Sequence, residues 1–163
     1  MTDMAARWLS DEEQTAWRRL IAVISLLPQQ LDVRMREHHA ITMHEYWVLA
    51  MLSESPDRAL RMRELARRST ASPSRLSHTV ARLQERGWVT RHQATADRRG
   101  QTATLTDAGW RVVQDTAQAH VADVRDLVFD QLSEEQVQQL AAVCDQLLAV
   151  LDPSGERSPG GRR

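Results

Sequence analysis

The chain has 163 residues, of which 42% are hydrophobic, and this is enough for one domain with a sizeable core. Its single cysteine excludes an internal disulfide and a cysteine-based zinc site. No apolar run reaches the ~20 residues of a membrane helix, and the N-terminus lacks a signal-peptide pattern, so we expect a cytoplasmic protein without a membrane partner.

The formal net charge of −1 conceals an uneven distribution of charge along the chain. Residues 57–99 contain eleven arginines and four acidic residues, a local excess of seven positive charges, while the rest of the chain is acidic. A local basic patch is enough to attract DNA, because salt screens exposed charges beyond about 10 Å at 0.1 M. The overall charge therefore does not exclude a DNA-binding protein.

A long helix is predicted to begin at Ser10, which forms the capping box S-x-x-E with Glu13. Pro28 is expected to kink it. Its apolar residues lie on more than one face, so one face can cover the domain and another a partner subunit. The residues with helical spacing are Trp17, Leu20, Ile24, Leu27, Leu31 and Met35.

A second capping box, Thr42 to Glu45, predicts a helix from Met43 to Glu54. This helix is apolar nearly all round, which is typical of a buried scaffold. Three histidines nearby suggest a metal site, but their spacing crosses a helix break, and we expect a solvated turn and no metal. They are His38, His39 and His44.

Residues 61–68 and 73–86 are predicted to form two helices joined by the short turn of a helix-turn-helix. Ser72 is the N-cap of the second helix and Gly87 ends it. Its stripe of Leu76, Val80 and Leu83 must be buried. The opposite face is slim and rich in donors, as a helix in the major groove requires, although an ordinary solvated face would look similar. Its candidate DNA-binding residues are Ser72, Ser74, Arg75, Ser77, His78 and Arg82.

Residues 88–93 and 101–105 are predicted to form a hairpin, to which Leu60 adds a short strand. The polar segment 94–100 between them is longer than a tight hairpin needs. Its Asp97, Arg98 and Arg99 suit the narrow, electronegative minor groove, with Asp97 orienting Arg99. A solvated turn with an incidental ion pair is the alternative.

Two closing helices are predicted, from Thr106 to Gln131 and, after the capping box of Ser133 with Gln136, to Leu151. They form an apolar hairpin with no third local element to cover it, which favours a homodimer. The alternative is a monomer that folds this hairpin onto its own lobe. Cys144 lies on the apolar stripe of the last helix, and we expect it to be buried.

The segments LRMRELA, SRLSHTVARLQERGWVTR and DRRGQTATLTDAG together resemble the MarR family of multiple antibiotic resistance regulators. The resemblance implies a mainly helical fold with a small β-wing. It also implies a homodimer that binds a pseudo-palindromic operator in double-stranded DNA, acts as a repressor and is released by a small ligand. The arginine of the wing, like Arg99, would enter the minor groove while Asp97 holds it. The single domain 1–163 would divide into dimerisation helices (10–41 and 106–152), a winged helix-turn-helix lobe (42–105) and a flexible tail (153–163).

The resemblance places an effector between the dimerisation helices and the DNA-binding lobe. The candidate lining residues there are Trp17, Tyr46, Trp47 and Trp110, and an aromatic or phenolic effector would suit them. Aromatic residues at helical spacing are more often core, which is the alternative.

Catalytic sequence motifs are missing from the chain, which has no G-x-S-x-G, P-loop, H-E-x-x-H, G-x-G-x-x-G or C-x-x-C. We therefore expect no enzyme and no cofactor. A competing hypothesis is a winged-helix dimer that serves as a protein-interaction module without operator DNA. The basic segment argues against it.

Overall fold

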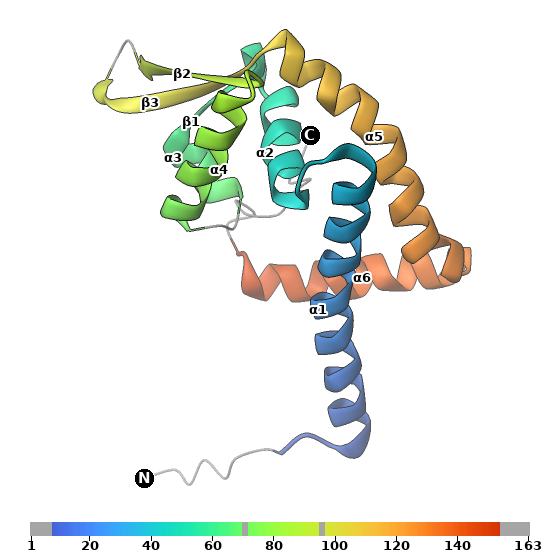
Figure 1. Ribbon diagram of the computed structural model, residues 1–163. Coiled ribbons are helices and arrows are strands. Elements are labelled where there is room, and N and C mark those ends of the chain that lie inside the picture. The colour runs from blue at the N-terminus through green and yellow to red at the C-terminus, as the bar shows by residue number, and fades with distance from the viewer. Residues whose placement is uncertain (1–7, 70–71, 95–96, 154–163) are drawn as a thin grey trace, which may run out of the picture.

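The computed structural model describes residues 8–69, 72–94 and 97–153, and the side chains of 94–99 lie outside the description. Within these ranges the chain is mainly helical with a small antiparallel sheet, which confirms the predicted fold class (Figure 1). The described elements are α1 (Asp11–His39), α2 (Met43–Ser53), η1 (Pro56–Arg58), β1 (Ala59–Arg61), α3 (Met62–Arg68), α4 (Pro73–Glu85), β2 (Val89–Ala94), β3 (Asp97–Leu105), α5 (Asp107–Leu127), η2 (Phe129–Gln131) and α6 (Glu134–Leu151).

Helix starts are set by side chains that satisfy the first free N–H groups. The three predicted capping boxes are present, at the N-termini of α1, α2 and α6. In α1 the helix continues through Pro28 for eleven more residues, to His39. The proline therefore does not divide the helix, and α1 is a single element 29 residues long.

The lobe made of α2, α3, α4 and the sheet has its own hydrophobic core. The predicted stripe of Leu76, Val80 and Leu83 on α4 is at most 1% exposed. It packs on a cluster completed by α2, α3, the sheet and one residue of α5, with Val48, Leu49, Leu52, Leu60, Leu65, Val89, Ala103, Leu105 and Val113. Since α2 lies beneath α4 in this core, the scaffold role expected for α2 is confirmed.

The sheet has the order β1-β3-β2, and Leu60 of β1 pairs with Ala103 of β3 as expected. The predicted long turn over residues 94–100 is wrong, because β3 already begins at Asp97 and Asp97 pairs with Ala94. The register is irregular between Gln93 and Ala94, where β3 has the extra residues. The irregularity absorbs residues that would otherwise form a loop.

The junction between the lobe and α5 depends on two glycines. Gly87 has φ +72° and turns the chain out of α4. Gly109, in the first turn of α5, lies so close to the sheet that an added Cβ would stand 2.2 Å from the Trp88 carbonyl oxygen. Thr106 caps α5 by accepting from the Gly109 N–H at 3.0 Å and donates to the Gly87 carbonyl at 2.8 Å. Through these contacts, residues 106–109 (T-D-A-G) hold the start of α5 against the end of α4.

The closing helices are much less covered than the lobe. None of the described residues of α6 is buried, and Val121 of α5 is 58% exposed. The expected burial of Cys144 is wrong for this single chain, because its thiol is on the exposed helix α6. The N-terminal half of α1 is exposed as well and extends past α6 (Figure 1).

Two terminal predictions lie outside the described residues: most of the frayed N-terminus, at 1–7, and the flexible tail, at 154–163. Among the helices that are described, none is both long and apolar enough to cross a membrane.

Candidate nucleic-acid interface

The outward face of α4 carries most of the predicted DNA-binding residues. Ser74, Arg75, Ser77, His78 and Arg82 lie on this face, away from the buried stripe. Ser72 is the N-cap, and its hydroxyl accepts from the Arg75 N–H at 3.3 Å, so it starts the helix. The structure therefore brings the polar groups together on the open side of a helix whose other side is fixed in the core.

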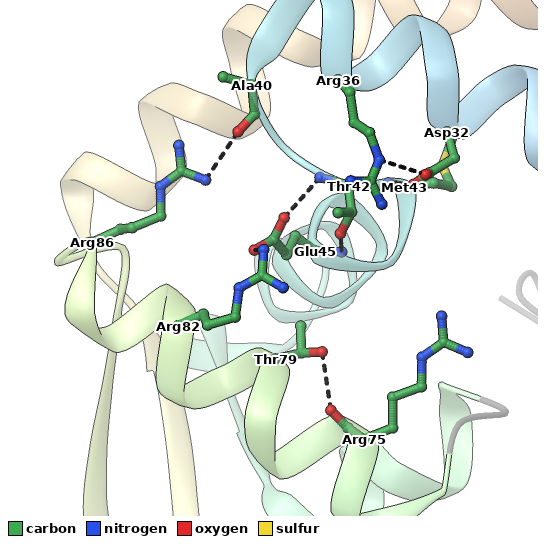
Figure 2. A network of polar contacts seen from close by, with 10 residues as sticks. All are labelled: Asp32, Arg36, Ala40, Thr42, Met43, Glu45, Arg75, Thr79, Arg82 and Arg86. Atoms are coloured by element: carbon green, nitrogen blue, oxygen red, sulfur yellow. Dashed lines mark hydrogen bonds and ion pairs between the residues drawn. The ribbon is translucent and has the colours of Figure 1, made fainter.

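Arg82 differs from its neighbours because it contacts an acidic side chain of α2. Its guanidinium lies 2.8 Å from one carboxylate oxygen of Glu45, whose side chain is only 2% exposed (Figure 2). The other oxygen accepts from the Thr42 N–H at 2.7 Å as part of the capping box. Glu45 therefore serves two helices, and the capping motif was its only signal in the sequence.

Arg86, one turn after Arg82, binds nearby, where α1 ends and α2 begins. It donates to the Ala40 carbonyl at 3.2 Å, and its guanidinium lies 3.8 Å from the centre of the Trp88 ring. Ala40 is the C-cap of α1 and has a left-handed φ of +53°. Sequence reasoning missed Arg86, because nothing local shows that the end of α4 meets the end of α1.

The wing places its acidic and basic residues at the start of β3. The backbone of Asp97, Arg98 and Arg99 is in that strand, at the end of the hairpin away from α5 (Figure 1). Their side chains lie outside the described part of the chain. The proposed roles of these side chains remain predictions.

Helix α3 adds further arginines beside α4. Arg67 donates twice to Glu64, at 2.8 and 2.9 Å, and Arg68 pairs with the same carboxylate. The hydrogen bonds from Arg67, together with Arg68 and against the effect of burial, lower the pKa of Glu64 to about 2. Glu64 therefore stays ionised and offsets part of the positive charge of the segment.

A cavity of about 890 Å³ lies between α1, α2 and α4. Its lining includes four arginines as well as apolar side chains. The lining residues are Pro28, Gln29, Asp32, Arg36, Thr42, Met43, His44, Trp47, Arg68, Ser69, Ser74, Arg75, His78, Thr79 and Arg82. Several of the predicted DNA-binding residues, including Arg75, His78 and Arg82, thus also line the cavity.

Two groups of the cavity have shifted pKa values. Burial raises the pKa of Asp32, but hydrogen bonds from the Met43 N–H and from Arg36 outweigh it, so the pKa lies below its ordinary value. Burial, aided by the charge of Arg75, lowers the pKa of His44. These surroundings favour the ionised form of Asp32 and the neutral form of His44.

The four predicted effector residues do not share one site. Trp47 lines the cavity, whereas Tyr46 is buried against the His120 ring with centroids 4.9 Å apart. Trp110 lies under the Arg58 guanidinium at 4.5 Å, and Trp17 is 53% exposed on α1. No group of three His, Cys, Asp or Glu side chains within the described ranges is placed to hold a metal ion.

Comparison with known proteins places this interface among transcription regulators. The profile of the MarR family matches residues 41–100. The chain is 43% identical to Sco3205 of Streptomyces coelicolor, a MarR family transcriptional regulator solved in complex with DNA, with a TM-score of 0.86 over 93% of this chain and 95% of that one.

Two further relatives agree with this placement. AbsC, a MarR family transcriptional regulator from the same organism, is 36% identical, with a TM-score of 0.83 over 91% of this chain and all of AbsC. The HTH-type transcriptional regulator PecS of Dickeya dadantii is 22% identical over 88% of this chain and 89% of PecS. The similarity to all three extends well beyond the basic segment, into the helices on both sides of the lobe.

Proposed function

The chain belongs to the MarR family of DNA-binding transcriptional regulators, and from this premise we propose that it is a homodimeric repressor released by a small ligand. The observation that carries the proposal is the exposed polar face of α4, held by an opposite face that is buried in the lobe. A helix with one buried face and one exposed polar face can enter the major groove without disturbing the core.

The residues proposed to contact DNA differ in their tasks. Ser74, Arg75, Ser77 and His78 occupy the first two turns of α4, the part of a recognition helix that meets base edges. Arg98 and Arg99 of the wing serve the adjacent minor groove or its phosphates, with Asp97 orienting Arg99. The 43% identical Sco3205 was solved in complex with DNA, which supports DNA binding by a chain of this fold.

A second copy of the chain is proposed as the partner of the uncovered helices. Large apolar side chains are exposed along α1 and α6, including Trp17, Ile24, Leu140 and Leu147. Many large apolar side chains exposed on the same helices are costly in water and favour an association site. A two-fold dimer would present two α4 helices to successive turns of one DNA face.

The cavity between α1, α2 and α4 is proposed as the effector site. Arg36, Arg68 and Arg75 supply positive charge, and Met43 and Trp47 supply apolar surface, so a small aromatic or phenolic anion fits its chemistry. Arg75 and His78 belong both to this cavity and to the proposed DNA face. A bound ligand would therefore compete with DNA for the same side chains.

The test is selection of duplexes from a random-sequence pool by the purified protein, followed by footprinting on the DNA upstream of its own gene. We expect a pseudo-palindromic site with half-sites about one helical turn apart. We also expect the protein in solution to have the mass of a dimer. Arg75→Ala should weaken binding to the selected site by roughly ten-fold. Absence of any selected duplex at low salt would refute operator binding and leave a protein-interaction module as the better hypothesis.

A further inference from the structure

Arg82 and the C-cap Arg86, at the C-terminal end of α4, bind the corner where α1 ends and α2 begins, at residues 40–45. Arg82 reaches Glu45 near the start of α2, and Arg86 reaches Ala40 at the end of α1 (Figure 2). We propose that Arg82 is a positioning residue, which sets the angle of α4 through its ion pair with Glu45, and that it is not a DNA contact. The inference rests on the proposed function of α4 as the DNA-reading helix.

The burial of Glu45 is the first argument. A carboxylate removed from water needs a compensating cation or donors on both oxygens. One oxygen accepts from the Thr42 N–H, whereas the other accepts no hydrogen bond within the described residues and is compensated by its ion pair with the Arg82 guanidinium. If Arg82 turned toward a phosphate, this second oxygen would be left buried and uncompensated.

The place of Arg82 along α4 is the second argument. It is the tenth residue of the helix, so its Cα lies roughly 13 Å along the axis from Pro73 at 1.5 Å per residue. Recognition helices meet base edges mainly with their N-terminal residues. Arg82 is near the opposite end, where the helix meets the α1–α2 corner.

The corner itself is cross-linked by hydrogen bonds, which is the third argument. Asp32 of α1 accepts from the Met43 N–H at 2.8 Å and from Arg36 at 2.6 Å, so the first turn of α2 is bound to α1. Glu45 then links α2 to Arg82, while Arg86 links the end of α1 to α4 directly. Through these bonds the orientation of α4 depends on α1.

One substitution can remove the charge of Glu45 and preserve its capping bond at the start of α2. The capping box of α6 uses Gln136 in place of a glutamate, with its side-chain oxygen 2.9 Å from the Ser133 N–H. Glu45→Gln should therefore keep the cap of α2 and lose only the ion pair with Arg82. Glu85→Gln is the matched control, because it removes the same charge from an exposed position on α4.

The experiment measures affinity for the duplex selected by the wild-type dimer, over a series of salt concentrations. The variants are Glu45→Gln, Arg82→Ala, Arg82→Lys and the double variant Glu45→Gln with Arg82→Ala. We expect Glu45→Gln and Arg82→Ala each to weaken binding by about ten-fold, a typical size for coupling between sites. We also expect the double variant to be no weaker than either single one, Arg82→Lys to restore part of the loss, and the salt slope to stay unchanged.

A phosphate contact by Arg82 gives the opposite pattern and would overturn the inference. Arg82→Ala would then lower the salt slope by about one unit for each of the two copies, and Glu45→Gln would leave affinity unchanged or raise it. Thermal melting separates a folding defect from a change of angle. If Arg82→Ala fails to fold, Glu45→Gln and Arg82→Lys still decide between the two patterns.

Failure of the proposed function is a separate outcome. A wild-type dimer that selects no duplex at low salt would refute operator binding itself, and the inference with it. A wild-type dimer that binds while Glu45→Gln behaves like Glu85→Gln would refute only the positioning role of Arg82.

Discussion

The DNA-binding lobe buries its apolar residues within the chain, whereas the closing helices leave many of theirs exposed. In the lobe, Leu49, Leu65 and Leu83 are fully buried by other elements of the same chain. In α6, Leu147, Leu148 and Leu151 are all more than 40% exposed. Both regions have the spacing of an amphipathic helix, so the pattern alone does not say whether the cover comes from the same chain or from another.

This difference suggests that the two regions acquire their stability from different sources. The lobe has a core of its own, whereas α6 and the first half of α1 depend on a second subunit in the proposed dimer. Of the four predictions below, the first two test that division and the other two test the surface of the lobe, in order from the largest expected effect to the smallest.

The apolar stripe of α6 should be essential for dimerisation. Leu140→Glu combined with Leu147→Glu should raise the dimer dissociation constant by at least about four orders of magnitude, because two side chains in each subunit each lose roughly 1.5–3 kcal/mol of burial. Sedimentation equilibrium measures the change, and operator binding should be lost with it. The control, Gln138→Glu with Gln146→Glu, adds the same charge outside the stripe. A charged stripe that leaves the dimer intact would place the interface elsewhere.

The lobe core should be sensitive whether or not the dimer forms. Leu83→Ala should lower the free energy of unfolding by about 2–5 kcal/mol, because it empties a fully buried position. Urea unfolding of the dissociated α6 variant measures this without the partner. In that background Val150→Ala, at a position 78% exposed, should change stability by less than about 0.5 kcal/mol. Equal effects of the two changes would contradict the division.

The wing should contribute to DNA affinity and not to stability. Arg99→Ala should weaken operator binding by roughly ten-fold, and the salt slope should fall by about one unit for each phosphate that the guanidinium no longer neutralises. Binding isotherms at several salt concentrations measure both. Arg125→Ala removes the same charge from α5, where it pairs with Asp130, and should change neither. An unaltered isotherm for Arg99→Ala would remove the wing from the mechanism.

The smallest effect expected is that of Glu64 on the pH dependence of stability. Because its pKa falls from 4.5 to about 2 on folding, its contribution is complete above about pH 4.5 and is lost as the pH falls toward 2. Glu64→Gln should therefore cost roughly 1 kcal/mol at pH 7, a value reduced by solvent screening, and almost nothing near pH 2. Urea unfolding across this range measures the difference. A difference that persists at pH 2 would show a packing effect instead.

Much of the fold followed from local signals in the sequence. The capping boxes at Ser10, Thr42 and Ser133, and the N-cap at Ser72, place four helix starts because each is satisfied within one turn. The buried stripe of α4 followed in the same way from helical periodicity. The fold class of the lobe was therefore predictable without tertiary information.

The remaining features depend on distant contacts. The early start of β3 depends on cross-strand pairing with Ala94, and the exposure of Cys144 depends on the lack of a covering element in the described chain. The partnership of Arg82 with Glu45 joins residues 37 positions apart, so no local pattern could separate it from the neighbouring exposed residues of α4. The predicted grouping of Trp17, Tyr46, Trp47 and Trp110 likewise required knowledge of helix packing.

The unbroken length of α1 has a mechanical consequence. Its last turns are fixed in the lobe through Met35, and Arg34 binds Asp123 and Asp126 of α5 at 3.1 and 2.7 Å. Its first turns lie at the other end of a rod of 29 residues, roughly 43 Å long at 1.5 Å per residue. A tilt of about five degrees at one end of such a lever displaces the other by roughly 3.8 Å, close to the rise of about 3.4 Å per base pair along a DNA strand. In the proposed dimer, small rotations between the two subunits would thus be amplified to the scale on which sequence is read.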